Sequence, residues 1–249
     1  MRRFFCSDLS ATGDICALSG QEAHHISNVL RMKEGDRVIL LNGDGFEYEA
    51  TLLALGDTVS ARIISKKPSQ SEPKCKITLY QGLAKGDKME DLFTRCVEAG
   101  VSAFVPVQCV RSVVRWDKKD AQKKTERLEK HVLSACKQCG RAYIPQVGDC
   151  LTTAEAACNP HGLKLVAYED ESACSLSSAV LGSDAEDIAI FIGPEGGIDP
   201  KEIDKLKQNG WQTVSLGKRI LRTENAGFAA AVLTLGLRGD MDARGDDNG

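Results

Sequence analysis

The chain has 249 residues, of which 42% are hydrophobic and 27% are charged. This balance is typical of a soluble globular protein with one large domain or two modest ones, and it excludes an intrinsically disordered chain. No apolar run approaches the ~20 residues that a membrane-spanning helix requires. Two arginines followed by a carboxylate at Asp8 do not have the pattern of a signal peptide. We therefore predict a cytoplasmic protein without a membrane segment.

The ten cysteines and four histidines form no metal-ligand pattern. Cys136 and Cys139 make the single C-x-x-C pair, whereas a structural zinc site of this kind needs a second pair. The cysteines are scattered along a chain with enough apolar residues to build a core, so disulfides are not needed for stability. We predict reduced cysteines and no metal site.

The formal net charge of −3 hides a gradient along the chain. Residues 71–150 carry 15 basic and 10 acidic side chains, whereas residues 151–249 carry 9 and 16. Nucleic acid can bind an acidic protein whose basic residues share one face, because phosphates are neutralised locally. The simpler interpretation is a solvated helix face, since acidic residues are interspersed in the basic run 111–127.

Residues 1–70 have the pattern of a small β-rich unit with one helix. Ser19 and Glu22 have the spacing of a capping box at a helix start, and Asn-Gly-Asp-Gly at 42–45 favours a hairpin turn. Strands are expected over residues 2–6, 37–41, 46–55 and 59–65. This pattern predicts a compact barrel, a shape common in RNA-binding modules. The expected linker is 66–73, which contains two prolines.

From residue 75 the pattern changes to alternating strands and helices. The expected strands cover residues 77–81, 103–108, 163–168, 187–192 and 213–216. The expected helices cover residues 89–99, 125–139 and 223–237, with one more that begins after an Asp199 N-cap and has Glu202 as its capping glutamate. The alternation predicts an α/β domain over residues 71–240, with a mostly parallel sheet covered by helices on both faces. The polar, glycine-rich residues 241–249 are expected to be a disordered tail.

Two segments that follow apolar strands have the composition of a ligand site. In the first, residues 190–200, an apolar strand runs into Gly-Pro-Glu-Gly-Gly and then into a capped helix. Ligands of parallel α/β sheets bind at the carboxyl ends of the strands, where glycines let backbone N–H groups approach them. The spacing fits neither G-x-G-x-x-G nor the P-loop, so it supports no dinucleotide or triphosphate site. A tight strand-to-helix turn without a ligand is the alternative.

The second segment, residues 214–231, passes from a strand through a stretch with two arginines into a helix rich in small residues. Ala226, Gly227, Ala230 and Ala231 leave one face of that helix almost without side chains. Another backbone can pack closely against such a face. This feature predicts either a tight helix–helix or dimer contact, or ordinary core packing.

Together these segments resemble the two signature loops of the SPOUT class of methyltransferases. Residues 191–197 read FIGPEGG, and residues 216–226 read LGKRILRTENA. More narrowly, the chain resembles the ribosomal RNA small subunit methyltransferase E family, whose members methylate N3 of a uridine in 16S rRNA. Further matches reach to about residue 238 and include RRFF at 2–5, HHISNVLR at 24–31, EAGV at 98–101, RSVV at 111–114 and QCGR at 138–141. The family usually has serine and threonine where this chain has Cys139 and Asn225, so no hydroxyl-specific role is expected there.

The resemblance implies a fold and partners that periodicity does not reveal. It implies an N-terminal PUA-like β-barrel that binds RNA, followed by a SPOUT domain with a deep trefoil knot. It also implies a homodimer, S-adenosylmethionine as the cofactor, and 16S rRNA of the small ribosomal subunit as the substrate. General topology rules treat knots as nearly absent, so this feature depends on the resemblance alone.

The resemblance also assigns the cofactor to particular residues. Its cofactor-loop positions are Ile192, Gly193, Gly197, Leu216, Gly217, Ile220 and Leu221. Apolar side chains there would enclose the adenine, while backbone groups bind its edge. Glu169 is the candidate for the ribose hydroxyls, because a carboxylate can accept from both, and Asp170 is its competitor.

Methyl transfer from a sulfonium is a direct displacement, so it needs close alignment of methyl group and acceptor but no metal. The N3 proton of uridine must leave, either to a base or with cations stabilising the charge on the ring oxygens. Glu195 is the candidate base, and Arg219 and Arg222 are the candidate stabilisers. Alternatively, Glu195 holds the loop or caps the next helix, and the arginines pair with Glu195 or Glu224. A target base inside a stacked helix would have to flip out.

Arginines are the candidate RNA contacts, because the planar guanidinium forms paired hydrogen bonds with phosphate. The candidates are Arg2, Arg3, Arg31, Arg111 and Arg141. His24 and His25 could also contact RNA, although the favoured interpretation has one of them partly buried under the first helix.

Three other functions compete with uridine-N3 methylation. One is a SPOUT methyltransferase that acts on a ribose 2′-hydroxyl or on tRNA, which the two-domain layout and the N-terminal motifs disfavour. Another is a non-catalytic RNA-binding or assembly protein with the same fold, which the intact glycines of both loops disfavour. The third is a dinucleotide-linked α/β enzyme, whose glycine fingerprint and acidic partner are missing.

Overall fold

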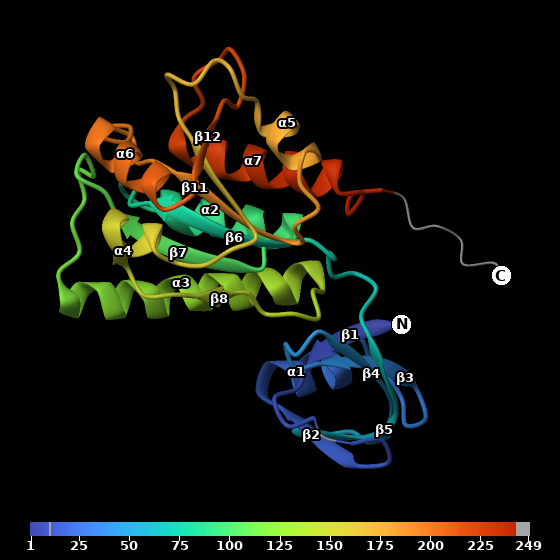
Figure 1. The fold of residues 1–249 in the computed structure, drawn as a ribbon. Helices are drawn as coiled ribbons and strands as arrows, with labels where there is room; N and C mark the ends of the chain where they lie inside the picture. Colours follow the sequence, from blue (N-terminus) through green and yellow to red (C-terminus); the bar gives the residue numbers. More distant parts are fainter. Residues whose placement is uncertain (10, 243–249) are drawn as a thin grey trace. The chain divides into compact units, whose positions relative to one another are not determined.

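The structure, a computed structural model, describes residues 1–9 and 11–242 (Figure 1). The chain forms two compact units. The N-terminal unit consists of Met1–Glu72 together with Cys136–Ile144, and the C-terminal unit consists of Pro73–Ala135 and the chain from Pro145 onward. Of the expected tail 241–249, residues 243–249 lie outside the described residues.

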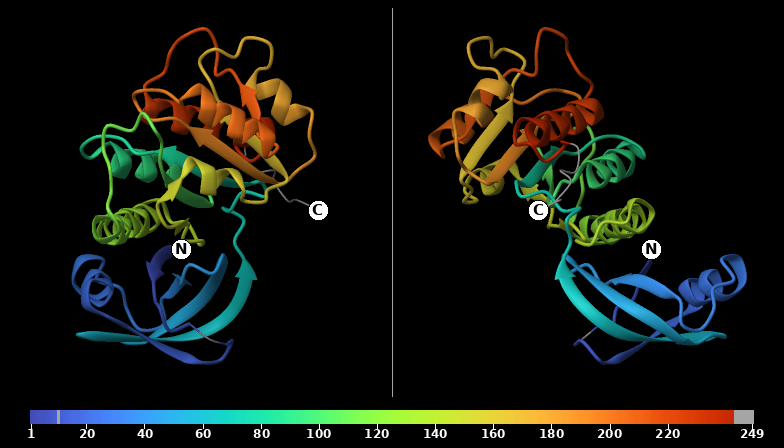
Figure 2. Two further views of the ribbon diagram at one scale, coloured as in Figure 1. Left: turned by 60° about the vertical axis from the view of Figure 1, so that its left-hand side comes forward. Right: turned by 90° about the vertical axis from the view of Figure 1, so that its right-hand side faces the viewer.

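A five-stranded sheet, in the order β1-β3-β4-β5-β2, forms the N-terminal unit. Its strands are β1 Arg2–Phe5, β2 Ile15–Ser19, β3 Arg37–Leu41, β4 Phe46–Ala54 and β5 Thr58–Pro68. The sheet curls around a core that includes Phe4, Leu18 and Tyr48 (Figure 2). The short helix α1, Gly20–His24, continues directly into the π-helical turn His25–Val29. The β-rich unit predicted from the sequence is confirmed, in the form of a curled half-barrel.

Three details of this unit differ from the sequence prediction. β2 is absent from the prediction, because its alternating pattern is only five residues long. β5 extends into the expected linker and ends at Pro68, which is tolerated at a strand end. The capping box at Ser19 is wrong, since its side chain makes no capping hydrogen bond. Ser19 instead pairs with Thr58 as the last residue of β2, and Gly20 turns the chain with a φ of 60°.

A distant segment of the chain completes the N-terminal unit. Ala142, in residues 136–144, forms a small apolar cluster with Ile39 and Leu41 of β3. Its carbonyl oxygen accepts a hydrogen bond of 3.0 Å from the Gly45 backbone N–H. The segment therefore adds apolar cover and backbone pairing to the turn between β3 and β4.

A seven-stranded sheet forms the centre of the C-terminal unit, with the path β12-β10-β11-β6-β7-β8 and with β9 beside β7. The strand pairs in this sheet are parallel. The strands are β6 Lys76–Gly82, β7 Ala103–Gln108, β8 Gln146–Val147, β9 Leu151–Thr152, β10 Leu163–Ala167, β11 Asp187–Ile192 and β12 Gln212–Val214. The central strand β11 is buried from Ile188 to Ile192, as expected for a strand covered on both faces.

Helices cover both faces of this sheet (Figures 1 and 2). They are α2 Lys88–Ala99, α3 Lys118–Cys139, α4 Thr153–Ala157, α5 Leu176–Leu181, α6 Pro200–Gln208 and α7 Thr223–Leu237. On one face α4 and α6 pack on a cluster that contains Tyr80, Phe191 and Trp211. On the other face α7 packs against β6, β11 and α2. The predicted parallel α/β domain is confirmed.

The small residues of α7 pack inside the same chain. Ala230 and Ala231 are fully buried. A side chain at Gly227 would lie 3.2 Å from Leu92 of α2 and 3.0 Å from Gln81 of β6. Core packing within one chain therefore accounts for the bare helix face noted in the sequence.

The remaining differences from prediction concern elements with weak periodicity. α3 begins at Lys118 rather than at residue 125, because its first turns are polar. β8, β9, α4 and α5 are too short to give a periodic signal. At α6 the predicted capping box is confirmed: the Asp199 side chain accepts from the Lys201 N–H at 3.0 Å, and Glu202 Oε2 accepts from the Asp199 N–H at 3.2 Å.

The composition-based expectations concern membranes, metals and thiols. Among residues 1–9 and 11–242, no helix has the length and apolar character needed to cross a membrane. The same residues contain no cluster of three His, Cys, Asp or Glu side chains that could hold a metal ion. All ten cysteines are free thiols, and six of them are buried.

Candidate functional site

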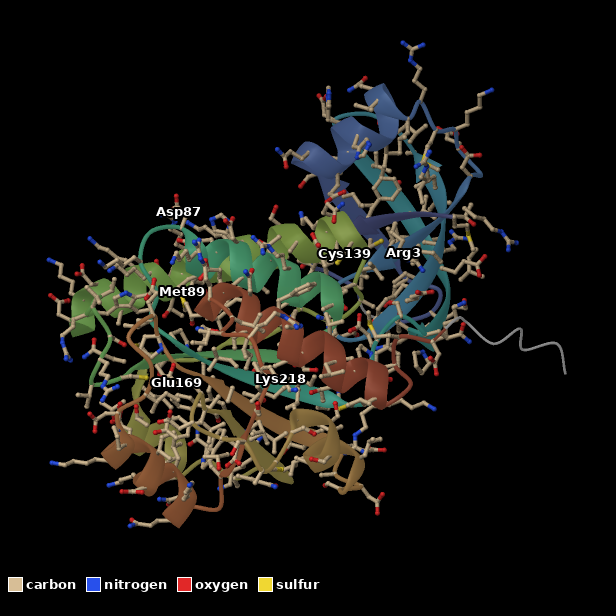
Figure 3. The ribbon with its side chains drawn as sticks, turned by 90° about the horizontal axis from the view of Figure 1, so that it is seen from above. Arg3, Asp87, Met89, Cys139, Glu169 and Lys218 are labelled. Atoms are coloured by element: carbon tan, nitrogen blue, oxygen red, sulfur yellow. The ribbon has the colours of Figure 1, made fainter. Side chains whose placement is uncertain are left out.

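Five loops of the C-terminal unit follow the carboxyl ends of its parallel strands. They are the β6–α2 loop (83–87), the β7–α3 loop (109–117), the β10–α5 loop (168–175), the β11–α6 loop (193–199) and the β12–α7 loop (215–222). The carboxyl ends of parallel strands share one edge of a sheet, so these loops gather at that edge. Figure 3 labels Glu169 and Lys218, which come from two of them.

The β11–α6 loop is packed tightly between its neighbours. A side chain at Gly82, the last residue of β6, would collide with the backbone of Pro194. A side chain at Gly196 would lie 2.8 Å from the carbonyl oxygen of Arg111 in the β7–α3 loop. Glycine at both positions is what allows these loops to approach so closely.

A chain of hydrogen bonds joins the same loop to the start of α7. The Thr223 hydroxyl donates to the Gly193 carbonyl at 2.6 Å and accepts from Gln81 Nε2 at 2.8 Å. Gln81 Nε2 also donates to the Gly82 carbonyl at 3.1 Å. Gln81 and Thr223 are both buried, so these bonds replace water for the Thr223 hydroxyl and for Gln81 Nε2, whereas Gln81 Oε1 has no partner among the described residues. They fix the end of β6, the β11–α6 loop and α7 relative to one another.

Glu195 is held by groups from the β6–α2 side. Its carboxylate accepts from the Lys85 backbone N–H and from the Lys88 ammonium, each at 3.1 Å. Burial raises the pKa of Glu195, but these hydrogen bonds and the charge of Lys88 outweigh it, so the pKa lies below its usual value. A carboxylate that is ionised and already hydrogen-bonded is a weak base. The geometry therefore favours the loop-holding role for Glu195 over the role of general base.

Lys88 links Glu195 to the start of α7, since its ammonium also lies 3.6 Å from Glu224 Oε2. The sequence suggested Arg219 or Arg222 as the partner of these carboxylates. Within the described residues Lys88 makes both ion pairs, and this replaces that alternative. Arg222 is the N-cap residue of α7, and both arginines are exposed.

The structure brings several of the candidate cofactor residues together. Glu169 Oε1 lies 3.2 Å from where a side chain at Gly197 would be. Gly193 begins the same β11–α6 loop, directly after the buried Ile192 at the end of β11. Glu169 and its competitor Asp170 are both exposed, so either carboxylate can meet a ligand at this edge.

The other candidate cofactor residues lie in the β12–α7 loop. Leu216 and Leu221 are half-buried, whereas Gly217 is exposed and Ile220 is 87% exposed. Gly217 has a φ of 107°, which favours glycine. An exposed apolar side chain beside bare backbone gives this loop a surface that a ligand can cover.

The candidate RNA arginines differ in how far the fold already uses them. In the N-terminal unit Arg2 and Arg31 are exposed. Arg3 forms an ion pair with Glu47 at 2.9 Å, and its side chain remains 38% exposed. In the C-terminal unit the Arg111 guanidinium lies 3.4 Å from Asp199, which places it at the candidate cofactor site rather than on a separate face.

Arg141 is a structural residue of the N-terminal unit. Its side chain is 6% exposed, and its guanidinium donates to Glu72 Oε2 at 3.1 Å from Nε and at 2.7 Å from Nη2. Glu72 Oε1 accepts from the backbone N–H groups of Ala142 and Tyr143. A buried guanidinium held in this way does not face a phosphate, so the geometry argues against the RNA contact predicted for Arg141.

His24 and His25 are both exposed, so the interpretation in which one of them is partly buried is wrong. The cause is local. α1 passes into a π-helical turn that directs Ala23 and Ile26 inward and leaves the two histidines on the outside.

Four residues of this site were not predicted from the sequence: Gln81, Lys85, Lys88 and Thr223. The signal that points to two of them, Lys85 and Lys88, is the position of the Lys-Gly-Asp-Lys stretch 85–88. It directly follows an apolar strand of the parallel sheet, as the two recognised loops do, and such positions meet at one edge.

Two family models and several known proteins are similar to this chain. Residues 70–235 match a family model described as an RNA methyltransferase domain, and residues 18–64 match one described as an RNA methyltransferase PUA domain. The ribosomal RNA small subunit methyltransferase E of Bacillus subtilis is 37% identical, over 90% of this chain and 93% of that protein. The chain belongs to this family.

Other members of the ribosomal RNA small subunit methyltransferase E family agree. The protein of this name from Mycobacterium bovis is 30% identical, over 98% of this chain and 93% of its own length. A crystal structure of the Neisseria gonorrhoeae protein, bound to S-adenosyl methionine, is 33% identical with a TM-score of 0.82 and covers 95% of this chain and 98% of its own. The family resemblance, the SPOUT-type α/β fold and the N-terminal PUA-like domain are thereby confirmed.

Proposed function

We propose that this chain is an S-adenosylmethionine-dependent methyltransferase that methylates N3 of a uridine in 16S rRNA. The names of the Bacillus subtilis and Mycobacterium bovis relatives support ribosomal RNA of the small subunit as the substrate. The Neisseria gonorrhoeae relative, crystallised with S-adenosyl methionine, supports the cofactor. The observation that carries the proposal is the meeting of the Glu169 carboxylate with Gly197 at the carboxyl edge of the sheet.

The residues at this edge fit the chemistry of S-adenosylmethionine. Gly197 and Gly217 leave backbone groups uncovered by side chains, so a ligand can approach them. Ile220 and the half-buried Leu216 offer apolar surface for an adenine ring. The Glu169 carboxylate can accept hydrogen bonds from both ribose hydroxyls. When bound, the cofactor supplies an electrophilic methyl group on a sulfonium.

Arg222 is the proposed stabiliser of charge on the acceptor base. As the N-cap of α7 it directly precedes Thr223, whose hydroxyl is bonded to Gly193. A guanidinium near the uracil oxygens favours the form of the base that has lost its N3 proton to water. Glu195 has a lowered pKa and holds the loop as a carboxylate, so Arg222 rather than Glu195 makes the N3 atom nucleophilic. With the cofactor bound, its methyl group would be the electrophile for N3, and Arg222 would hold the charge on the uracil oxygens.

The N-terminal unit is the proposed RNA-binding module. Arg2, Arg3 and Arg31 are its candidate phosphate contacts, because each retains an exposed side chain. Arg141 is not among them because it is committed to Glu72. A homodimer, a trefoil knot, a cytoplasmic location and the small ribosomal subunit as the natural substrate complete the proposal, and family membership supports them.

The first test is titration calorimetry with S-adenosylmethionine and S-adenosylhomocysteine, with NAD as the control. We expect micromolar binding of the first two ligands and none of NAD. Loss of binding in Glu169→Gln, with Asp170→Asn as the matched variant, would tell which carboxylate binds the ribose. Failure of the folded wild-type protein to bind either ligand would contradict the proposed cofactor.

The second test is methyl transfer to unmodified 16S rRNA, supplied as a free transcript and within reconstituted small subunits. Mass spectrometry of the digested RNA should show 3-methyluridine, because N3 methylation survives digestion to nucleosides. A methyl group on a ribose 2′-oxygen, or methylation of tRNA alone, would replace the proposed reaction by the competing SPOUT activity. Binding of RNA without methyl transfer would favour the non-catalytic alternative.

A further inference from the structure

The β7–α3 loop carries exposed apolar and cationic side chains beside the candidate cofactor site. Val110 and Val113 are 61% and 62% exposed, so two aliphatic side chains of one loop are open to solvent. Arg111 and Arg115 are exposed in the same loop. Residues 109–116 contain these two arginines and no carboxylate, so the loop is locally basic in an acidic protein.

Hydrogen bonds within the loop hold it in one shape. The Cys109 N–H donates to Ser112 Oγ and the Ser112 N–H donates to the Cys109 carbonyl, each at 3.1 Å. Arg115 Nη2 donates to the Val110 carbonyl at 3.1 Å. These hydrogen bonds order the loop that carries the exposed valines. Little conformational entropy would therefore be lost when a ligand covers them.

A buried carboxylate anchors the loop to the start of α6. Glu202 Oε1 accepts from the Val110 N–H at 3.0 Å and from the Thr153 hydroxyl at 2.5 Å, while Oε2 accepts from the Asp199 N–H. Arg111 adds its ion pair with Asp199 at 3.4 Å. Because Asp199 ends the β11–α6 loop, the two loops form one continuous surface.

We infer that the β7–α3 loop is the wall against which the acceptor RNA binds: Val110 and Val113 pack on an unstacked base, and Arg111 and Arg115 contact the phosphates beside it. The inference rests on the proposed function and adds the acceptor side of the same site. A base that leaves its stack offers an apolar face next to an anionic backbone, and the loop offers the complementary pair of surfaces.

Charge selects RNA over a second copy of this chain as the occupant. A two-fold contact between copies with its axis at this loop would bring the loop against its own copy, so the arginines of both loops would face each other. Like charges at such a contact are unfavourable. An RNA strand, in contrast, gains from every cation in the loop.

The test compares two loop variants with two matched controls. Val113→Ser and Arg115→Ala change exposed side chains of the loop, whereas Leu181→Ser in α5 and Arg95→Ala in α2 change equally exposed side chains elsewhere. We expect each loop variant to bind unmodified 16S rRNA about 5- to 10-fold more weakly. Arg115→Ala should also reduce the salt dependence of binding by about one counterion. Both controls should bind RNA as the wild type does.

Two further readouts make the result specific. The affinity for S-adenosylhomocysteine should stay within about twofold of wild type in the loop variants, because their side chains face the acceptor. The oligomeric state of the loop variants, measured as the mass of the particle in solution, should also match that of the wild type. RNA binding at wild-type strength, an equal loss in the controls, or a change of mass in Val113→Ser would overturn the inference, the last in favour of a contact between copies. RNA binding is measured separately from methyl transfer. A wild-type protein that binds RNA but transfers no methyl group would therefore contradict the proposed function, and not the inference that the β7–α3 loop binds RNA.

Discussion

The β11–α6 and β12–α7 loops of the candidate site are built in opposite ways. The first is pressed against Gly82, bonded through Gly193 to Thr223, and tied through Glu195 to Lys88. The second is exposed along residues 217–220. One half of the site is thus set by the fold before any ligand binds, whereas the other half exposes surface that a ligand or partner must cover. Mutations at the contacts of the first loop should accordingly lower the free energy of unfolding, whereas mutations in the second loop should mainly affect the reaction.

Gly82→Ala should give the largest effect on the preformed half. The added methyl group meets the Pro194 backbone, which cannot yield as a flexible side chain would. We expect a loss of about 3 kcal/mol in the free energy of unfolding, measured with denaturant, together with weaker S-adenosylmethionine binding. Gly236→Ala in α7 is the control, since a methyl group there meets nothing within 4 Å. Equal stability of the two variants would mean that this close approach is not needed.

Thr223→Val should have the next largest effect. Valine keeps the shape of threonine but leaves Gln81 Nε2 and the Gly193 carbonyl without this partner. The expected loss is about 2 kcal/mol in the free energy of unfolding. Thr234→Val is a matched control in the same helix, because the buried Thr234 hydroxyl has no partner among the described residues. That change should be neutral or stabilising, and a loss as large as in Thr223→Val would contradict the role of the network.

Glu195→Gln should reveal a pH-dependent contribution of about 1 kcal/mol. The pKa of Glu195 is lowered in the folded chain, so the folded state favours the carboxylate. That stability is present at neutral pH and is lost as the pH falls through the lowered pKa. The difference in unfolding free energy between wild type and variant should therefore shrink on acidification. Glu98→Gln, exposed in α2, should show no such trend.

Arg222→Ala should have the smallest effect on stability and a large effect on the reaction. The side chain is exposed at the N-cap of α7, so the free energy of unfolding should change by less than about 0.5 kcal/mol. Methyl transfer should fall about 100-fold if the guanidinium stabilises charge on the acceptor. Arg95→Ala serves as the control. A rate within a fewfold of wild type would remove Arg222 from the mechanism.

Elements with a clear period or cap were predictable from the sequence. Strands 103–108 and 187–192, the helix 223–237 and the Asp199 capping box agree with the structure because local patterns determine them. β2 and the first turns of α3 were not predictable, since one is too short and the other too polar to show a period. Ser19 does precede the first helix as its N-cap residue, but its side chain makes no capping hydrogen bond, and its backbone also pairs with Thr58 at the end of β2.

The candidate site was predictable only where it lies in recognisable loops. Gly193 and Gly197 stand out from composition, but Gln81 and Lys88 matter through contacts made across the chain. Arg141 illustrates the same limit in the other direction. From the sequence alone Arg141 is expected to be an exposed cation. In the structure it is buried and paired with Glu72, which lies far away in the chain. Long-range pairing decides which charges remain available to a substrate.

The segment 136–144 has a consequence for dissecting the protein. A fragment cut after Glu72 would contain all five strands of the N-terminal sheet, yet it would lack part of that unit. Ile39 and Leu41 would lose the cover of Ala142. The Glu72 carboxylate would lose its ion pair with Arg141 and the hydrogen bonds that it accepts from two backbone N–H groups. The N-terminal unit is continuous in space but interrupted in sequence, so no single uninterrupted stretch of the gene encodes all of it.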